Sequence, residues 1–364
     1  MVNLKTSNRI SLRRGAALTG MVALAAAGLT ACGNDGGSGG GDEVGVSLIV
    51  KTTTNPFFVA MQDGAKAAAE KNGVSLTMAA GKADGDEDTQ IQAIENAVAR
   101  GDAGILITPN GPSVVDAIQR ARDQGLYVIA LDTPPDPADA VDITFATDNR
   151  EAGKLIGQWT ATQLDGEKAT IAMLDLFDDK VVSVDYDRDQ GFLEGMGIDV
   201  ADPKVNGDEV STGSYSGGDY ELVGNEASQG AEDGGRTAME NLLTKNPDVN
   251  VVYTINEPAA YGAYQALEAA GKEKDDVLLL SVDGGCAGVD NVKEGVIDAT
   301  SQQYPVKMAE LGVEAIAQLA ETGEKPETTE GLDFFNTGVE LVTDTPADGV
   351  DSIDSDAASE ICWG

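Results

Sequence analysis

The feature that most constrains the fold of this chain is a regular alternation of short apolar segments with amphipathic ones. Strand-like runs from residue 44 onward read VGVSLIV, VSLTMAA, AGILIT, LYVIAL, ITFAT, ATIAMLDL, NVVYTI and VLLLSV. Helix-like stretches separate them at 57–72, 88–100, 112–124, 149–164, 222–245 and 257–271. Uniformly apolar strands that alternate with helices indicate parallel sheets covered on both faces. The sequence therefore predicts an α/β protein with doubly wound parallel sheets.

Polar segments follow the predicted strands. They read KTTTNPFF, TPNGPS, DTPPDP, DLFDDKVVSVDYDR, INEPAA and VDGGCAG. Sheets of this kind bind ligands beyond the carboxyl ends of their strands. The Asn, Asp and Thr side chains in these segments supply hydrogen bonds, so this edge is the expected place of a binding site.

Length and charge narrow the class of protein. The chain has 364 residues, enough for two domains with their own cores. Its 24 basic and 62 acidic residues give a net charge of −38. Such an excess argues against nucleic acid as a partner and against electrostatic attraction to anionic lipid, and it fits a solvated acidic surface.

The N-terminus is typical of an export signal. Four basic residues precede an apolar, alanine-rich stretch from Gly15 to Leu29. This stretch is shorter than the ~20 residues of a membrane span. It ends in LTAC, which resembles a bacterial lipobox, so Cys32 is the predicted lipid attachment site. We expect residues 1–31 to be a lipoprotein signal peptide and residues 32–43, rich in Gly and Ser, to be a flexible tether.

The other two cysteines are Cys286 and Cys362. In an exported protein the surroundings are oxidising, which favours a disulfide that ties the C-terminal EICWG to the body of the protein. Two unpaired buried thiols remain the alternative, because spacing does not fix connectivity.

The composition excludes much catalytic chemistry. The chain has no histidine, which removes Ser-His-Asp triads, histidine acid–base catalysis and histidine metal sites. It also has no Walker-type phosphate loop and no Gly-x-Gly-x-x-Gly after a strand. We expect a binding protein without a cofactor rather than an enzyme.

One segment partly matches a calcium loop. DGDEDTQIQAIE, residues 84–95, has Asp at positions one, three and five and Glu at position twelve of an EF-hand loop. Position six needs glycine for its turn and is Thr89 here. Ile91, Ile94 and Val98 follow at helical spacing, and the helix dipole favours acidic residues at a helix start. The segment therefore predicts the beginning of a helix and no metal site.

Several motifs occur together and in one order: TNPFFVAMQDGAKAA, TPN, ALDTP, INEPAAYGAYQAL, SVDGGCAG and ATSQQYP. With this set the sequence resembles the periplasmic sugar-binding proteins of ABC importers, of the ribose/fructose-binding type, from about Val44 to the C-terminus. The stretches GGCAG, SQQYP and CWG look most like the fructose-binding branch.

The resemblance implies two doubly wound lobes that close on one monosaccharide. Their three crossovers are expected near Asp132, at Gln303 to Pro305 and at Leu332 to Asn336. The expected N-terminal lobe is 44–131 plus 304–333, and the expected C-terminal lobe is 132–303 plus 334–364. Such a protein is a monomer, anchored through Cys32 to the outer face of the cytoplasmic membrane. It passes its sugar to ABC permease subunits with a cytoplasmic ATPase.

The pair Phe57 and Phe58 fits this interpretation. Successive helix residues point about 100° apart, so the two rings cannot both face one core stripe. The resemblance implies that one ring or both cover an apolar face of the sugar while Asn55 binds a hydroxyl. The alternative is that one Phe fills the interior of the lobe and the other is a hydrophobic staple at the start of the helix.

Further ligand-binding positions follow from the resemblance: Asp132, Arg188, Asn256, Asp283 and Gln303. The fork of Arg188 suits two vicinal hydroxyls, and a surface ion pair is its alternative role. For Asn256 the alternative is capping of a turn. Gln302 should point away from Gln303 if the segment is extended.

The chain departs from the ribose-type pattern at one turn. Ribose-type members carry an aspartate there, and this chain has Asn110 followed by Gly111. The change removes a hydrogen-bond acceptor and weakens ribose as the ligand. We expect Asn110 to replace it, with Lys51 as an additional donor.

Other classes of function fit the sequence less well or stay open. A binding protein for a chemoreceptor or sensor kinase stays open. A sugar-responsive repressor needs a basic helix-turn-helix headpiece, whereas this N-terminus is an export signal. An enzyme could use Asp132 and Asp283 as paired carboxylates, but no second feature supports turnover.

Overall fold

The structure is a computed structural model that describes residues 43–364. The predicted signal peptide, Cys32 and residues 33–42 of the predicted tether lie outside the described residues. Within the described part of the chain, no helix is long and apolar enough to cross a membrane.

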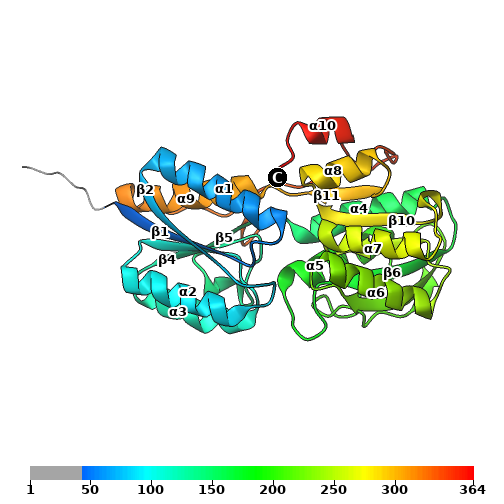
Figure 1. Ribbon diagram of the computed structural model, residues 1–364, viewed down its shortest axis with the longest axis horizontal. Helices are drawn as coiled ribbons and strands as arrows, with labels where there is room; N and C mark the ends of the chain where they lie inside the picture. Colours follow the sequence, from blue (N-terminus) through cyan, green and yellow to red (C-terminus); the bar gives the residue numbers. More distant parts are fainter. Residues whose placement is uncertain (1–42) are drawn as a thin grey trace, which may run out of the picture. The chain divides into compact units, whose positions relative to one another are not determined.

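The first lobe is built on a parallel sheet with the strand order β12-β5-β4-β3-β1-β2 (Figure 1). Its strands are β1 (Val44–Val50), β2 (Val74–Ala80), β3 (Gly104–Ile107), β4 (Tyr127–Leu131), β5 (Ile143–Ala146) and β12 (Phe335–Asn336). Alternate residues of β1 face opposite ways, so Leu48 and Ile49 belong to different halves of the core. Helices α1 (Pro56–Asn72) and α9 (Pro305–Thr322) pack on one face, and α2 (Glu87–Arg100) and α3 (Val115–Asp123) pack on the other.

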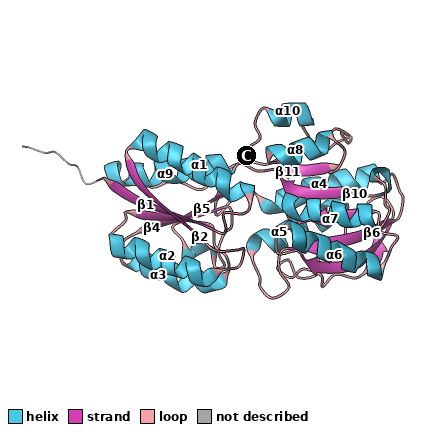
Figure 2. Ribbon diagram, viewed as in Figure 1, coloured by secondary structure: helices cyan, strands magenta, loops and turns pink. Residues whose placement is uncertain are grey.

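The second lobe has a mainly parallel sheet with the order β13-β11-β10-β9-β6-β8-β7, in which both edge strands are antiparallel to their neighbours. Its strands are β6 (Ala169–Asp175), β7 (Thr212–Ser214), β8 (Asp219–Ala227), β9 (Val251–Thr254), β10 (Leu278–Asp283), β11 (Ala299–Gln302) and β13 (Glu340–Val342). Helices α4 (Asn149–Gln163) and α5 (Ser183–Met196) cover one face. Helices α6 (Glu232–Lys245), α7 (Glu257–Ala269) and α8 (Cys286–Lys293) cover the other, and α10 (Ser355–Ser359) follows near the C-terminus (Figure 2). Short 3-10 turns span Pro112–Val114, Ala138–Ala140 and Lys274–Asp276.

Local sequence explains how the site-bearing helices start and pack. Asn55 caps α1, because its Oδ1 accepts a hydrogen bond of 2.9 Å from the Phe57 N–H. Pro56 occupies the first turn, where its missing N–H costs nothing. In the second lobe α4 and α5 touch closely, because a Cβ on Gly153 would collide with the backbone of Arg188. This contact fixes α5 and the arginine that it carries.

Two of the expected crossovers need correction. Strand β5 pairs with β4, so the chain leaves the first sheet after Ala146 and not near Asp132. The run ITFAT is apolar enough to join the first sheet, and Asp132 lies in the turn before it with φ 64°. Strand β12 pairs with β5, which places Phe335 and Asn336 in the first lobe as well. The chain passes between the lobes once more between β11 and α9.

One helix prediction was wrong in its first half. The stretch 222–245 was expected to be helical, but residues 219–227 form β8 and α6 begins only at Glu232. Strand β8 pairs with β6 along its length, and this pairing overrides the helical pattern read from the sequence.

The predicted disulfide between Cys286 and Cys362 is confirmed. The bond holds the C-terminal segment against the start of α8, where the Cys286 N–H also donates to the Trp363 carbonyl at 2.9 Å. The Trp363 indole N–H donates to the Gln303 carbonyl at 2.8 Å. The disulfide therefore holds Trp363 at the passage between β11 and α9.

Candidate functional site

A narrow cavity lies where the carboxyl ends of strands from both sheets come together. Lining residues from the first lobe are Lys51, Asn55, Phe57, Phe58, Asp84 and Asp132; those from the second lobe are Leu176, Val184, Arg188, Ile255, Asn256 and Asp283. Its open space is about 30 Å³, room for about two water molecules. Every sequence-predicted site residue lines it except Asn110 and Gln303.

Surface hollows elsewhere are larger but less suited to binding a small polar ligand. The hollow beside Arg122, Tyr127 and Lys325 measures about 630 Å³. It lies near Ala103 and Leu126, which precede β3 and β4, and so at the end of the sheet opposite the predicted site. We therefore assign the candidate site to the small cavity, where buried polar groups of both lobes converge.

An aromatic wall forms one side of the cavity. Phe57 and Phe58 are 3% and 4% exposed, and their rings meet edge to face with centroids 5.3 Å apart. Phe57 meets Trp363 in the same way at 5.3 Å. Both phenylalanines belong to the core of the first lobe and also line the cavity. The two rings thus contribute both to the core packing and to the wall of the cavity. Trp363 supports this wall by packing on Phe57, a role that the sequence did not predict.

A charged triad links the lobes. Lys51 Nζ lies 3.8 Å from Asp132 Oδ2, and Arg188 Nη2 lies 3.7 Å from Asp132 Oδ1. All three side chains are at most 6% exposed. Thr133 Oγ1 donates to Asp132 Oδ2 at 2.7 Å, which orients the carboxylate. Since Asp132 belongs to the first lobe and Arg188 to the second, this ion pair forms across the cavity.

Arg188 is held firmly by its own lobe. Its Nε donates to Asn149 Oδ1 at 2.7 Å, and its Nη1 donates to the Ile255 carbonyl at 2.9 Å. The alternative of a surface ion pair is wrong, because the residue is buried. With two donors anchored, the remaining Nη2 faces Asp132 and the cavity.

Asp283 ends β10 beside a second buried carboxyl group. Its Oδ1 accepts from Gln303 Nε2 at 3.1 Å. Burial raises the pKa of Asp283 to about 7, although Arg188 opposes the shift. Behind it, Glu257 accepts from the N–H groups of Gly284 at 2.8 Å and Gly285 at 3.2 Å. Burial and the nearby Asp283 raise the pKa of Glu257 to about 8.

These raised pKa values predict that the ligand-free protein loses stability as pH rises. Unfolded carboxyl groups titrate near pH 4, so between about pH 4 and 8 the folded state binds more protons than the unfolded one. The free energy of unfolding should therefore fall from pH 5 to pH 8 by on the order of 6 kcal/mol, because each group contributes about 1.4 kcal/mol for every pH unit below its raised pKa. Urea unfolding at both pH values measures the difference, and Asp283→Asn should reduce it. Stability that increased over this range would contradict the prediction.

The two asparagines at the cavity cap helices. Asn55 Oδ1 is occupied by the start of α1. Asn256 Oδ1 accepts from the Ala259 N–H at 3.1 Å, and its Nδ2 donates to the Gly230 carbonyl at 3.1 Å. The capping role proposed as the alternative for Asn256 is therefore present, in a residue that also lines the cavity.

Asn110 does not lie at the cavity, which corrects its expected role. It is 1% exposed, and its Oδ1 accepts from the Gly85 N–H at 3.0 Å. Its Nδ2 donates to the carbonyls of Lys51 and Asp86, each at 3.2 Å. Because its amide is fully engaged with backbone, Asn110 fixes the loop between β2 and α2 instead of contacting a ligand.

That loop delivers a residue that the sequence analysis assigned only to a helix start. Asp84 lines the cavity, and its buried Oδ1 has no hydrogen-bond partner within the described chain. Burial raises the pKa of Asp84, against the attraction of Lys51. Its position after β2, at the carboxyl edge of the sheet, was the signal that could have identified it. Asp84 supplies a carboxylate to the first-lobe side of the site, which lacks the aspartate of the ribose-type turn.

Gln303 also lies outside the cavity lining. Its side chain orients Asp283, as described above, so it supports the site from behind. Gln302 donates its Nε2 to the Gly284 carbonyl at 2.9 Å. The two glutamines thus have different partners.

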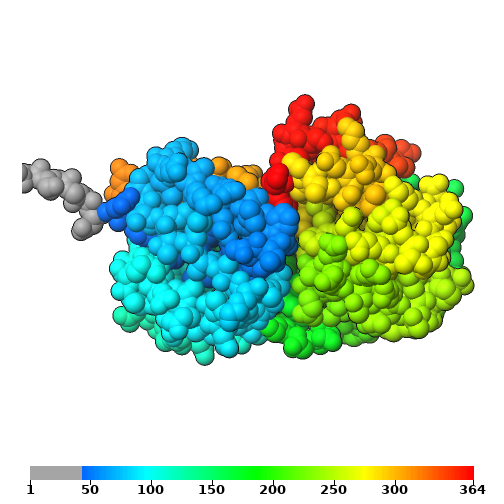
Figure 3. All heavy atoms as spheres, viewed as in Figure 1, coloured from blue at the N-terminus to red at the C-terminus, as the bar shows by residue number. Residues whose placement is uncertain are grey.

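The first lobe and the second lobe touch each other in the space-filling view of Figure 3. Further hydrogen bonds join them. Lys180 Nζ from the second lobe donates to the Gly85 carbonyl at 2.6 Å and lies 3.8 Å from Glu87 Oε2. Ser183 Oγ donates to the Pro134 carbonyl at 2.6 Å. These hydrogen bonds hold the lobes together around the site.

Comparison with known proteins places this arrangement in a family. Residues 46–325 match the family model of the periplasmic binding protein domain. The chain belongs to this family. It is 30% identical over 290 residues to the ribose import binding protein of Salmonella typhimurium, covering 79% of this chain and 88% of that protein. It is 27% identical over 307 residues to the D-ribose/D-allose-binding protein of Pseudomonas aeruginosa, covering 82% and 88%.

Solved structures agree with the fold. A solute-binding protein of an ABC transporter from Agrobacterium vitis with bound D-fucose superposes with a TM-score of 0.71 at 26% identity, covering 88% of this chain and 100% of that one. A protein from Mycobacterium smegmatis in complex with β-D-fucofuranose has a TM-score of 0.69 at 24% identity, covering 87% and 93%. This sugar-binding protein is thus a monosaccharide-binding component of an ABC importer, of the ribose/allose type, and not an enzyme.

Proposed function

We propose that this periplasmic binding protein captures fructose, or a closely similar monosaccharide, between its lobes and is anchored at the membrane through Cys32. The observation that carries the proposal is the cavity between the lobes, with an aromatic wall and converging buried carboxylates and cations. A monosaccharide has apolar C–H patches that suit Phe57 and Phe58, and a rim of hydroxyls that suits charged hydrogen-bonding groups.

The charged side chains that line the cavity suit a neutral ligand with many hydroxyl groups. Asp84, Asp132 and Asp283 offer acceptors, and Lys51 and Arg188 offer donors. The separations of 3.7 and 3.8 Å in the charged triad exceed hydrogen-bond length, so these groups keep capacity for hydroxyls. The cavity of about 30 Å³ is smaller than a sugar, so the lobes must separate to admit one.

The ligand would then stabilise the closed arrangement by contacting both lobes at once. Contacts from the first lobe come from the aromatic wall and Asp84, and those from the second come from Arg188 and Asp283. Fructose is favoured over ribose on two grounds. The sequence motifs look most like the fructose-binding branch, and the ribose-type aspartate is replaced by an asparagine that lies away from the cavity.

A thermal-shift screen against monosaccharides tests the proposal. The panel contains D-fructose, D-ribose, D-allose, D-xylose, D-glucose and D-mannose. A ligand at 1,000 times its dissociation constant stabilises a protein by about 4 kcal/mol, a shift of several degrees. Fructose should give the largest shift, and Phe58→Ala should remove it. A larger shift with ribose or allose would replace the proposed sugar, and a flat panel would overturn the assignment of the cavity.

Asp84→Asn should weaken binding of the cognate sugar by about 10- to 100-fold. The substitution keeps the shape of the side chain but removes the charge and replaces one acceptor oxygen by an NH₂ donor, so hydroxyls that donate to the carboxylate are held less strongly. Isothermal titration calorimetry measures the change. Asp88→Asn is the matched control, because Asp88 is exposed on the first turn of the neighbouring helix. Equal affinities of the two variants would remove Asp84 from the site.

The lipid anchor rests on the LTAC motif at Cys32. Acylation there, with more than one chain for stable attachment, would keep the binding protein close to its permease. Cell fractionation tests this: the full-length protein should be found with membranes and the Cys32→Ser variant should not. A wild-type protein that fractionates away from membranes would exclude the anchor.

A further inference from the structure

Three branched aliphatic side chains form part of the second-lobe wall of the cavity. They are Leu176, Val184 and Ile255, each at most 4% exposed, and they belong to one hydrophobic cluster. The aromatic wall of Phe57 and Phe58 comes from the first lobe. Among the described residues that line the cavity, the second lobe contributes no aromatic ring. The two lobes therefore present different apolar surfaces to a ligand, one flat and aromatic and the other branched and aliphatic.

The fold explains why these three side chains reach the cavity. Leu176 directly follows β6, and Ile255 directly follows β9. Val184 lies in the first turn of α5, the helix that comes after β6. All three thus lie at the carboxyl edge of the second sheet, where sheets of this kind bind their ligands.

The backbone groups beside two of these side chains are already paired within the protein. The Leu176 N–H donates to Asp185 Oδ1 at 2.8 Å, and the Leu176 carbonyl accepts from the Gln229 N–H at 2.9 Å. The Ile255 N–H donates to a β6 carbonyl at 3.0 Å, and the Ile255 carbonyl accepts from Arg188 Nη1 at 2.9 Å. In this part of the wall a ligand therefore meets mainly carbon.

We propose that Leu176, Val184 and Ile255 form a subsite for an apolar carbon that projects from the sugar ring, so that a methyl group fits there at least as well as a hydroxymethyl group. The inference rests on the proposed sugar-binding function and adds deoxy sugars to the ligand class. A hydroxyl pressed against this surface would lose its hydrogen bonds to water without replacement, whereas a methyl group gains by leaving water. An aromatic ring suits the flat face of a sugar, and branched side chains can surround a projecting group.

The competing explanation is that these side chains only fill the core of the second lobe. Their cluster, however, is separate from the two larger clusters that fill this lobe on either face of its sheet. When the lobes separate to admit a ligand, the cavity wall meets water, which is unfavourable for aliphatic side chains. Contact with an apolar part of the ligand accounts for their presence at this place.

Deoxy congeners of the bound sugar test the subsite. For D-fructose the probes are 1-deoxy-D-fructose and 6-deoxy-D-fructose, and isothermal titration calorimetry compares their dissociation constants with that of the parent sugar. If the monosaccharide screen selects another sugar, the probe lacks the hydroxyl on the terminal carbon of that sugar. Removing a hydroxyl that the protein binds weakens binding by about 10- to 100-fold. We expect at least one congener to bind as tightly as the parent sugar or more tightly.

Two variants identify the subsite. Val184→Thr keeps the shape of the side chain and adds a hydroxyl that a methyl group would leave without a partner. The ratio of the dissociation constants of the tolerated congener and the parent sugar should therefore rise by about tenfold. Leu176→Asn should change the ratio in the same direction. Val181→Thr is the matched control, because Val181 is 58% exposed in the loop before α5 and lies outside the cavity lining.

The ratio compares two sugars on one variant, so a general loss of stability does not change it. The proposal is overturned if every congener loses tenfold or more in affinity, or if both variants leave the ratio at its wild-type value. In that case the parent sugar still binds, and only the subsite fails. If no monosaccharide binds at all, the proposed function fails and the subsite fails with it.

Discussion

Arg188→Lys should raise the dissociation constant for the cognate sugar by about 100-fold. The guanidinium makes two hydrogen bonds to its own lobe and still presents Nη2 to Asp132 and the cavity. Lysine keeps the charge but has a single nitrogen on a flexible stem, so it cannot hold Asn149 and the Ile255 carbonyl while reaching the sugar. Hydrogen bonds to charged groups in a desolvated site contribute about 1.5–3 kcal/mol each, consistent with a loss of this size.

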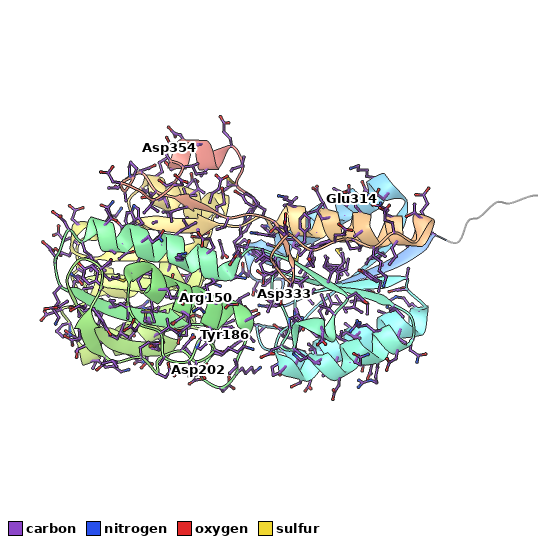
Figure 4. The ribbon with its side chains drawn as sticks, turned by 180° about the vertical axis from the view of Figure 1, so that it is seen from behind. Arg150, Tyr186, Asp202, Glu314, Asp333 and Asp354 are labelled. Carbon is purple, nitrogen blue, oxygen red and sulfur yellow. A yellow bond between two sulfur atoms is a disulfide. The ribbon has the colours of Figure 1, made fainter. Side chains whose placement is uncertain are left out.

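Isothermal titration calorimetry of the Arg188→Lys variant with the best sugar of the screen checks this prediction. Arg150→Lys is the control, because Arg150 lies partly exposed on α4 and pairs with Glu194 on the surface of the same lobe (Figure 4). The control should bind the sugar within about threefold of the wild type. An Arg188→Lys variant that bound equally well would show that the arginine only braces its lobe. Unfolding curves of both variants separate lost binding from lost folding.

Removing the disulfide with Cys286→Ser and Cys362→Ser should lower the free energy of unfolding by about 4 kcal/mol. The cross-link spans 76 residues of sequence, and a loop of that size restricts the unfolded chain by about this amount. Chemical denaturation of the oxidised wild type and the double variant measures the difference. A change below about 1 kcal/mol would contradict the prediction.

The same double variant should also bind sugar more weakly. The disulfide holds the C-terminal segment that carries Trp363, and this ring packs on Phe57 with centroids 5.3 Å apart. Trp363→Leu with the disulfide intact separates the two effects: it should reduce sugar affinity and leave most of the stability. If the disulfide variant bound the sugar with normal affinity, the aromatic wall would not depend on a disulfide that holds Trp363 in place.

Much of the fold followed from the pattern of the chain. Apolar runs such as LYVIAL and VLLLSV predicted buried parallel strands, because a strand covered on both faces needs apolar side chains on both. The same pattern did not predict where the chain passes from one lobe to the other. ITFAT reads equally well as a strand of either sheet, and only its pairing with β4 assigns it to the first lobe.

The residues of the candidate site also include some whose role the sequence predicted and some whose role it did not. Residues directly after predicted strands, including Asp132, Asn256 and Asp283, were expected at the carboxyl edge and line the cavity. Asn110 was expected to contact ligand, but its amide holds the neighbouring loop instead. Asp84 was interpreted as the acidic start of a helix, and the folded loop turns it into the cavity.

The sequence by itself determined the α/β class, the binding rather than catalytic chemistry, and the edge of the sheets at which polar groups collect. These properties depend on periodicity and residue type, which can be read along the chain. The tertiary structure decided which polar side chains face the cavity and which form hydrogen bonds with backbone groups instead. That choice depends on contacts between distant segments, such as Asn110 with the Lys51 carbonyl, and a chain pattern does not contain them.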